Sequence, residues 1–183
     1  MDATSNKPPN AEQLLRGLVR DVPDFPKAGI IYKDITPLLA SRRGLAASLD
    51  LLARAHAHQE IDIVVGIESR GFIFGAALAA RLGAGFVPAR KPGKLPAATR
   101  TQKYALEYGH DTLEMHEDAI TAGERVLICD DLIATGGTAN ATGQLVEQLG
   151  GELVGYSFVI ELAFLNGRKQ LNGANIHSLI QYD

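Results

Sequence analysis

The stretch Val126-Leu-Ile-Cys-Asp-Asp-Leu-Ile-Ala-Thr-Gly-Gly-Thr138 decides how the rest of this chain is expected to fold. Its first four residues are apolar without interruption, which predicts a β-strand buried on both faces. Asp130 and Asp131 stand at the expected end of that strand, and five small or short residues follow at 134–138. Apolar residues at helical spacing come next, so this small-residue loop is expected to open a helix.

A glycine-rich turn at a helix N-terminus suits an anion, because its free amides and the positive end of the helix dipole point the same way. Carboxylates only accept hydrogen bonds, so Asp130 and Asp131 suit paired sugar hydroxyls better than a second anion. Together the two features predict a site for a ribose 5-phosphate. The alternative is a plain strand-turn-helix corner with two solvated acids, which would be preferred for an isolated Gly-Gly-Thr. The stretch lacks the Gly-Lys-Ser/Thr ending of a P-loop and the Gly-x-Gly-x-x-Gly motif of a dinucleotide-binding turn.

Strands and helices alternate along most of the chain. Strands are expected over 29–32, 61–67, 86–89, 125–129, 153–160 and 176–180, and helices over 11–20, 43–58 and 72–82. This alternation is typical of an α/β protein with a central parallel sheet flanked by helices. Ligands of such sheets bind beyond the carboxyl ends of the strands, so 68–71, 90–94 and 130–138 are expected to meet in one crevice.

The segment 99–120 has a different pattern. Tyr104, Leu106 and Tyr108 alternate with polar residues, as do Leu113 and Met115, and Gly-His-Asp lies between the two runs. Alternation on both sides of a turn predicts a β-hairpin.

Length and composition limit the class of protein. With 183 residues and a net charge of −3, the chain is expected to be one domain and not a nucleic-acid-binding protein. Its single cysteine, Cys129, is interpreted as a core residue and excludes an internal disulfide. Residues 1–10 are polar and lack the apolar core of a signal peptide, so a flexible tail is expected before a domain over 11–183. With no membrane-length apolar run, a cytoplasmic location is expected.

Further motifs keep the same order as those of a known family. They are Phe25-Pro26 with Gly-Ile-Ile-Tyr-Lys-Asp-Ile-Thr at 29–36, Glu-Ser-Arg-Gly-Phe at 68–72, Arg-Lys-Pro-Gly-Lys-Leu-Pro at 90–96 and Leu-Glu-Tyr-Gly at 106–109. With the stretch at 126–138, they resemble the type I phosphoribosyltransferases, and among these the enzymes that act on adenine. The resemblance implies that family's fold, with a small N-terminal hood formed mainly by 11–36 and a mobile hairpin loop at about 99–118.

The resemblance implies a purine-salvage reaction. Adenine and 5-phosphoribosyl-1-pyrophosphate would give AMP and pyrophosphate by displacement at the anomeric carbon, through a ribosyl-cation-like transition state. It also implies Mg²⁺ bound through substrate and water, with no direct protein ligand, and a homodimer. The histidines are scattered and are not interpreted as metal ligands.

The resemblance assigns roles to particular residues, according to the part of the substrates that each is expected to bind. The 5-phosphate would bind Ala134, Thr135, Gly136, Gly137 and Thr138, and the ribose hydroxyls Asp130 and Asp131. Pyrophosphate would bind Ser69, Arg70, Arg90, Lys91 and Lys94, near a 68–69 peptide that is often cis in the family. Adenine would bind Ile31, Tyr32 and Leu132, and Tyr108 would bind the ribosyl donor or AMP. Glu107 would act as general acid or base, and Arg70 would stabilise the leaving group.

Several of these assignments have alternatives. Lys33 stands where many relatives carry arginine, so its pyrophosphate contact loses the bidentate fork, and Tyr32 replaces a common phenylalanine. Thr138 has the alternative of a plain helix N-cap, and Glu107 that of an exposed charge on a hairpin. For the whole chain, the rivals are the same chemistry on hypoxanthine, guanine or xanthine, a regulator that senses the ribosyl pyrophosphate, and a catalytically silent interaction protein.

Overall fold

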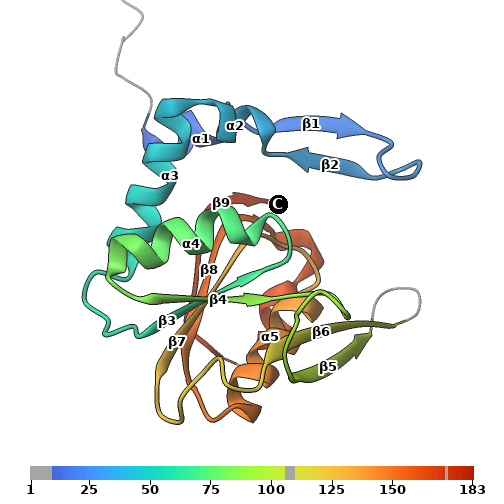
Figure 1. The fold of residues 1–183 in the computed structure, drawn as a ribbon. Helices are drawn as coiled ribbons and strands as arrows, with labels where there is room; N and C mark the ends of the chain where they lie inside the picture. The colour runs from blue at the N-terminus through green and yellow to red at the C-terminus, as the bar shows by residue number, and fades with distance from the viewer. Residues whose placement is uncertain (1–9, 106–109, 172) are drawn as a thin grey trace, which may run out of the picture. The chain divides into compact units, whose positions relative to one another are not determined.

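The computed structural model describes residues 10–105, 110–171 and 173–183 (Figure 1). The chain forms two compact units that divide between Asp50 and Leu51. Most of the expected tail, at 1–9, and the tip of the hairpin, at 106–109, lie outside the described residues. Among the helices described, none has both the length and the apolar character that a membrane crossing requires.

The N-terminal unit consists of short elements. They are α1 (Ala11–Arg16), β1 (Arg20–Pro23), β2 (Ile31–Asp34), α2 (Thr36–Ala40) and the first part of α3 (Arg42–Ala55), which continues into the second unit. β1 and β2 form an antiparallel pair in which Val22 lies opposite Tyr32. Asn10, which was expected in the tail, caps α1 by accepting a hydrogen bond from the backbone N–H of Gln13 at 2.8 Å.

Two predicted boundaries in this unit are wrong. The helix expected over 11–20 ends at Arg16, because the chain from Arg20 onward pairs with β2 as a strand. The strand expected over 29–32 begins only at Ile31, because Gly29 has a φ of +86°, outside the extended region of a strand.

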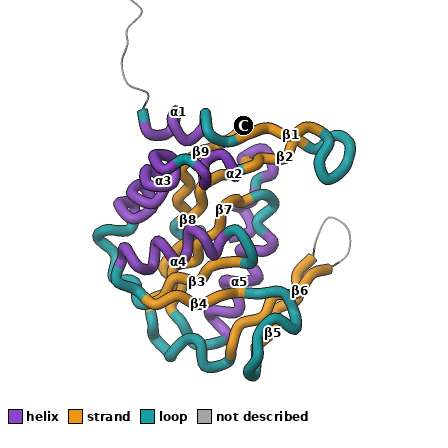
Figure 2. Tube along the Cα trace, turned by 45° about the horizontal axis from the view of Figure 1, so that its top comes forward, coloured by secondary structure: helices purple, strands orange, loops and turns teal. Residues whose placement is uncertain are grey.

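The second unit contains a five-stranded parallel sheet, which confirms the predicted fold class. Its strands are β3 (Ile63–Ile67), β4 (Gly85–Ala89), β7 (Arg125–Ile133), β8 (Glu152–Leu162) and β9 (Ile176–Tyr182), in the order β4-β3-β7-β8-β9. The helices α4 (Gly71–Leu82) and α5 (Gly137–Gln148) lie on opposite sides of this sheet (Figures 1 and 2). Two short 3₁₀ helices that the sequence did not predict, η1 (Ala163–Leu165) and η2 (Gly167–Leu171), follow β8.

Close contacts at glycines fix the helices on the two faces. On one face, a Cβ added to Gly75 of α4 would lie 3.2 Å from the Cα of Gly66 in β3. On the other, a Cβ added to Gly143 of α5 would overlap the hydroxyl of Tyr156 in β8. Between these layers lies a core of fully buried apolar side chains that includes Ile128 and Phe158.

The predicted hairpin is confirmed in the residues that the structure describes. β5 (Thr99–Ala105) pairs with β6 (His110–His116) as an antiparallel ribbon in which Tyr104 lies opposite Asp111. Leu113 and Met115 of β6 are fully buried in the core, which holds this ribbon against the α5 side of the sheet (Figure 1).

Replacing the core side chain Phe158 with alanine tests this packing. Phe158→Ala should lower the free energy of unfolding by about 3–5 kcal/mol, because the ring is fully buried and its loss leaves a cavity. Phe164→Ala is the matched control, since that ring is 58% exposed, and its effect should stay within about 0.5 kcal/mol. Urea unfolding followed by circular dichroism measures both, and equal losses would contradict the burial described.

Candidate active site

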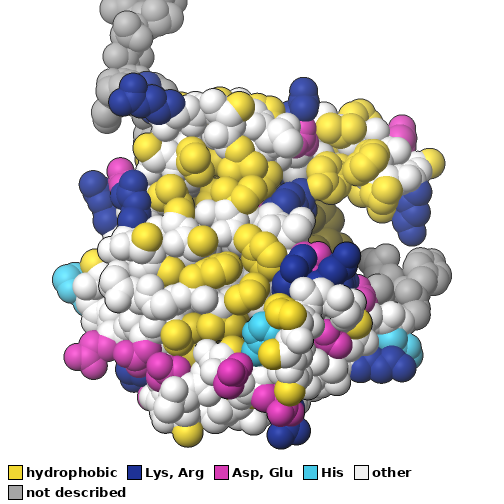
Figure 3. All heavy atoms as spheres, in the orientation of Figure 1, with side chains coloured by type: hydrophobic (Ala, Val, Ile, Leu, Met, Phe, Trp, Pro, Cys, Tyr) yellow, Lys and Arg dark blue, Asp and Glu magenta, His cyan; other side chains and the backbone are white. Residues whose placement is uncertain are grey.

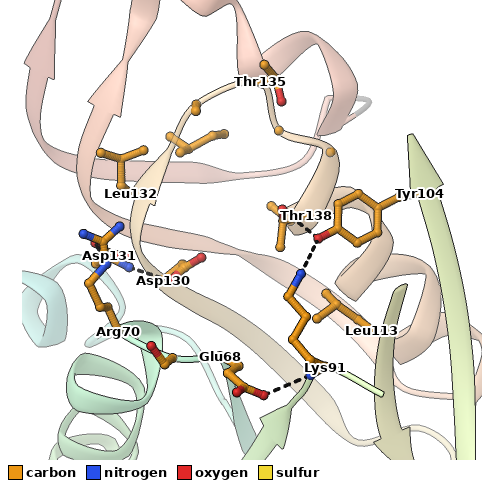
Figure 4. A pocket seen from close by; sticks show the side chains of 16 residues that line it. Glu68, Arg70, Lys91, Tyr104, Leu113, Asp130, Asp131, Leu132, Thr135 and Thr138 are labelled. Carbon is orange, nitrogen blue, oxygen red and sulfur yellow. Dashed lines mark hydrogen bonds and ion pairs between the residues drawn. The ribbon is translucent and has the colours of Figure 1, made fainter. Parts of the chain in front are cut away.

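A cavity of about 280 Å³ opens at the carboxyl end of the sheet in the second unit. Four stretches of chain supply its walls: the turn after β3, the segment after β4, the hairpin β5–β6, and the end of β7 with the start of α5 (Figure 4). The lining residues are Glu68, Ser69, Arg70, Lys91, Tyr104, Leu113, Asp130, Asp131, Leu132, Ile133, Ala134, Thr135, Gly136, Gly137, Thr138 and Ala139. The structure therefore brings together most of the residues selected for phosphate, ribose and pyrophosphate.

Other predicted site residues lie elsewhere or outside the described residues. Arg90 and Lys94 are not among the lining residues; the guanidinium of Arg90 donates to the Lys94 carbonyl at 3.2 Å. Glu107 and Tyr108 fall within 106–109, outside the described residues.

The residues predicted to bind the base belong to the N-terminal unit, apart from Leu132. Tyr32 packs edge-to-face against Phe25, with ring centroids 5.1 Å apart. Ile31 is 58% exposed, and Lys33 Nζ lies 2.7 Å from Asp21 Oδ1 in an ion pair. A small hollow lined by Val22, Phe25, Tyr32 and Asp34 opens beside these rings.

The acid pair lies within β7 and not after it, which corrects the expected strand end at Cys129. β7 continues to Ile133 because β8 pairs with it over its whole length, as far as Ile133 opposite Glu161. Asp131 is consequently only 4% exposed, which argues against the alternative of a plain corner with two solvated acids. Burial also raises the pKa of the Cys129 thiol, which agrees with its interpretation as a core residue.

The loop after β7 turns into α5 through glycine. Gly136 has a φ of +85°, a conformation that side chains disfavour, and it takes the N-cap position of α5. Thr138 is therefore not the N-cap, and that alternative is wrong. Its hydroxyl instead donates to the Tyr104 hydroxyl at 3.3 Å (Figure 4).

Burial of the acid pair perturbs its electrostatics. Burial raises the pKa of Asp130 well above its usual range, and the neighbouring Asp131 charge adds to the effect. Burial also raises the pKa of Asp131, against the opposing charge of Arg70, whose Nε lies 3.0 Å from Asp131 Oδ2. A Cβ added to Gly71 would lie only 2.7 Å from Asp130 Oδ1, so the start of α4 closes the side of this carboxyl. In the cavity, these carboxyls would gain from a ligand that donates hydrogen bonds.

Glu68 organises the basic side of the cavity. Its Oε2 accepts a hydrogen bond from the Lys91 backbone N–H at 2.9 Å and from Arg90 Nε at 3.1 Å. The hydrogen bond from Lys91 lowers the pKa of Glu68, and so does the one from Arg90. Lys91 Nζ forms an ion pair with Asp111 of the hairpin. The peptide between Glu68 and Ser69 is cis.

Five lining residues were not selected from the sequence as site residues: Glu68, Tyr104, Leu113, Ile133 and Ala139. The alternation of polar and apolar residues in the hairpin could have indicated Tyr104 and Leu113, because it places both side chains on one face of the ribbon. It does not show which face of the ribbon meets the cavity. Glu68 stood inside the Glu-Ser-Arg-Gly motif, and its carboxylate contacts become apparent only once Lys91 and Arg90 are placed.

Comparison with known proteins agrees with this geometry. A model of the phosphoribosyl transferase domain matches residues 32–172. An adenine phosphoribosyltransferase from Acaryochloris marina is 58% identical over 92% of this chain and 99% of that protein, and one from a Cyanothece species is 60% identical over the same shares. The chain belongs to the adenine phosphoribosyltransferase family.

Solved structures of this family share the fold. The adenine phosphoribosyltransferase of Thermoanaerobacter pseudethanolicus superimposes with a TM-score of 0.92 at 51% identity, covering 93% of this chain and 99% of that one. The enzyme of Saccharomyces cerevisiae, in complex with adenine and an imino-altritol bisphosphate, gives 0.87 at 45% identity over 92% and 98%. Both the sequence of this chain and the arrangement of its sheet therefore match the adenine phosphoribosyltransferase family.

The perturbed acid pair predicts a pH-dependent stability. Because the folded-state pKa of Asp130 is raised, its ionisation opposes folding as the pH rises above about 4, the usual range of an unfolded aspartate. Asp130→Asn should therefore melt at a higher temperature than wild type at pH ~8, and the gap should close toward pH ~4. A lower melting temperature for the variant throughout this range would contradict the raised pKa.

Glu161→Gln is the control of opposite sign. Hydrogen bonds from Arg168 lower the pKa of Glu161, so its charge stabilises the fold above the unfolded pKa and the contribution is lost as the pH falls. This variant should be less stable than wild type at neutral pH, with a deficit that shrinks in acid.

Proposed function

We propose that this chain catalyses the transfer of a phosphoribosyl group from 5-phosphoribosyl-1-pyrophosphate to adenine, which yields AMP and pyrophosphate. The observation that carries the proposal is the joining, in one cavity, of a glycine-bent loop at the start of α5 with the half-buried carboxyl of Asp130 and the buried carboxyl of Asp131. Backbone amides suit a phosphate, and carboxyls suit the hydroxyls of the ribose that carries it. Adenine phosphoribosyltransferases at 55–60% identity support the identity of the base.

The ribose end of the donor would be held at β7 and α5. We propose that the 134–138 loop binds the 5-phosphate through its amides and through the hydroxyls of Thr135 and Thr138. Asp130 and Asp131 would accept hydrogen bonds from the ribose hydroxyls, and their negative field would favour the cationic ring of the transition state. Holding both reactants in line can supply about 7–11 kcal/mol of the barrier.

The pyrophosphate end would be held by the turn after β3 and the segment after β4. Ser69 offers amide and hydroxyl donors at the start of α4, while Arg70 and Lys91 bring positive charge to the cavity wall. Arg70 would stabilise the charge that develops on the leaving oxygens. Arg90 and Lys94, which do not line the cavity, would add positive charge near the pyrophosphate. Lys33 would offer the pyrophosphate a single cationic contact in place of the bidentate fork of an arginine.

As the family resemblance implies, we propose that Tyr32 and Leu132 contact adenine and that the backbone near Ile31 reads its amine edge. The exposed Ile31 and the hollow beside Tyr32 leave aromatic and apolar surface for a flat base. The Saccharomyces cerevisiae relative, 45% identical, holds adenine in its structure, which favours adenine over an oxo-purine.

Magnesium is proposed as the cofactor, carried by the pyrophosphate. Oxygen donors line the cavity, and a hard cation of this kind prefers them and keeps several waters. Among the described residues, no group of three or more His, Cys, Asp or Glu side chains is arranged to hold a metal ion. When bound, the ion would neutralise charge on the pyrophosphate oxygens.

We also propose the remaining features that the family resemblance implied. The segment 11–36 would act as the hood of a single phosphoribosyltransferase domain over 11–183, and the enzyme would be a cytoplasmic homodimer. A regulator that binds nucleic acid is less well supported, since the net charge is −3 and the face drawn in Figure 3 intersperses basic with acidic side chains.

An assay of base specificity tests the proposed function. The protein is incubated with 5-phosphoribosyl-1-pyrophosphate, Mg²⁺ and one of adenine, hypoxanthine, guanine or xanthine, and nucleotides are separated by chromatography. We expect AMP from adenine alone, and its loss when a chelator removes the metal. Turnover of hypoxanthine would contradict the proposed specificity, and the absence of any nucleotide would contradict the enzyme assignment.

Glu107 is proposed as the general acid or base that exchanges a proton with the purine, on a hairpin loop that closes over the substrates and excludes water. Glu107→Gln should slow the chemical step about 10²–10⁴-fold in single-turnover experiments. Glu117→Gln is the control, because that exposed carboxylate follows β6 and pairs with Arg100 at 3.3 Å. An unchanged single-turnover rate for Glu107→Gln would remove the residue from the mechanism.

A further inference from the structure

The loop proposed to bind the 5-phosphate rests on a second loop, which follows β8 and contains η1 and η2. A Cβ added to Gly167 would overlap the Ala134 carbonyl oxygen and lie 3.1 Å from the Gly136 nitrogen. A Cβ added to Gly136 would in turn overlap the Gly167 carbonyl oxygen. The two backbones thus touch without side chains between them, so the position of the 134–136 backbone depends on where Gly167 is held.

Arg168 fixes this second loop to the sheet. Its Nε and Nη2 donate to Oε1 and Oε2 of Glu161, each at 2.6 Å, which makes a bidentate ion pair. Its Nη1 donates to the Ile176 carbonyl at 3.1 Å, and Ser178 Oγ donates to Glu161 Oε2 at 2.5 Å. One guanidinium therefore joins η2 to both β8 and β9.

The location of Glu161 connects this ion pair to the cavity. Glu161 lies opposite Ile133 in the β7–β8 pairing, and Ile133 is the last residue of β7 before the 134–136 loop. Glu161 is 5% exposed, and its pKa is lowered by the hydrogen bonds from Arg168, so it is charged at neutral pH. Neither Glu161 nor Arg168 lines the cavity, so an effect of this ion pair on a ligand is indirect, and the contact of Gly167 with Ala134 and Gly136 connects η2 to the loop.

We infer that the Arg168–Glu161 ion pair positions the phosphate-binding loop by holding Gly167 against the backbone of Ala134 and Gly136. Arg168 is thus a positioning residue and not a catalytic one. The inference rests on the proposed function, because it takes the ligand of the loop to be the 5-phosphate. Amide donors act on a phosphate only when they are aligned, so loosening Gly167 should weaken phosphoribosyl ligands and leave adenine binding unchanged.

Two substitutions at Arg168 test this inference. Calorimetry measures the Kd for ribose 5-phosphate, and steady-state assays measure the KM for each substrate. Arg168→Gln should raise the Kd for ribose 5-phosphate and the KM for the ribosyl pyrophosphate donor about tenfold, with an unchanged KM for adenine. Arg168→Lys should give Kd and KM values between those of wild type and Arg168→Gln, because lysine keeps the charge but loses the bidentate fork.

The ion pair between Arg125 and Glu152 provides a matched control. It joins β7 to β8, the strand that also carries Glu161, but at the opposite end of that strand, with Arg125 Nη1 2.7 Å from Glu152 Oε1 and Arg125 Nε donating to the Glu60 carbonyl at 2.8 Å. Arg125→Gln should lose thermal stability, as Arg168→Gln does, but keep the wild-type Kd for ribose 5-phosphate.

The outcomes separate the possible failures. A wild-type Kd for ribose 5-phosphate in Arg168→Gln would overturn the inference, and so would an equal weakening in Arg125→Gln, which would indicate a general loss of stability. If Arg168→Gln does not fold, Gly167→Ala tests the same contact, because its Cβ would meet the Ala134 carbonyl oxygen while both residues of the ion pair are kept, and it should show the same selective loss. Failure of the proposed function would instead appear in the wild type, as no binding of ribose 5-phosphate.

Discussion

The site depends on the parallel pairing of β7 with a neighbour on each of its edges. β3 pairs with its first half, and β8 pairs with it as far as Ile133. The double pairing holds β7 as far as Cys129, and the pairing with β8 alone carries the strand past Asp130 and Asp131, which therefore stand on a strand and not on a loop. The chain then turns at Ala134 to Gly136, and the residues of that turn line the same cavity as the two carboxyls.

Holding two carboxyls in such a place has an electrostatic cost, and the local contacts only partly offset it. Arg70 opposes the raised pKa of Asp131, and the Asp131 backbone N–H donates to Asp130 Oδ1 at 2.8 Å. Buried carboxyls with incomplete partners are destabilising unless a ligand completes them. The geometry therefore favours the bound state at the expense of the empty one, which is typical of a site organised before its ligand arrives.

The features that could be predicted from the sequence were local ones. An unbroken apolar run, two acids and a glycine-rich turn at 126–138 predicted a strand, a crevice and the start of a helix. β1 was missed because its strand character comes from pairing with β2, as in Arg20 opposite Asp34, and not from its own short sequence. The same limit applied at the site: Tyr104 and Glu68 were not selected, because their contacts with Thr138 and Lys91 join segments far apart in the chain.

The cations beside the cavity already contact carboxylates. Arg70 contacts Asp131, Arg90 contacts Glu68, and Lys91 contacts Asp111. A ligand must therefore exchange partners with the protein, and its net gain is the difference between the contacts it makes and those it displaces. An anion that offers charge alone gains little from such an exchange. A molecule that carries a phosphate, a pyrophosphate and a pair of hydroxyls at the right spacing can replace all of these contacts together, so the internal ion pairs disfavour the binding of simpler anions.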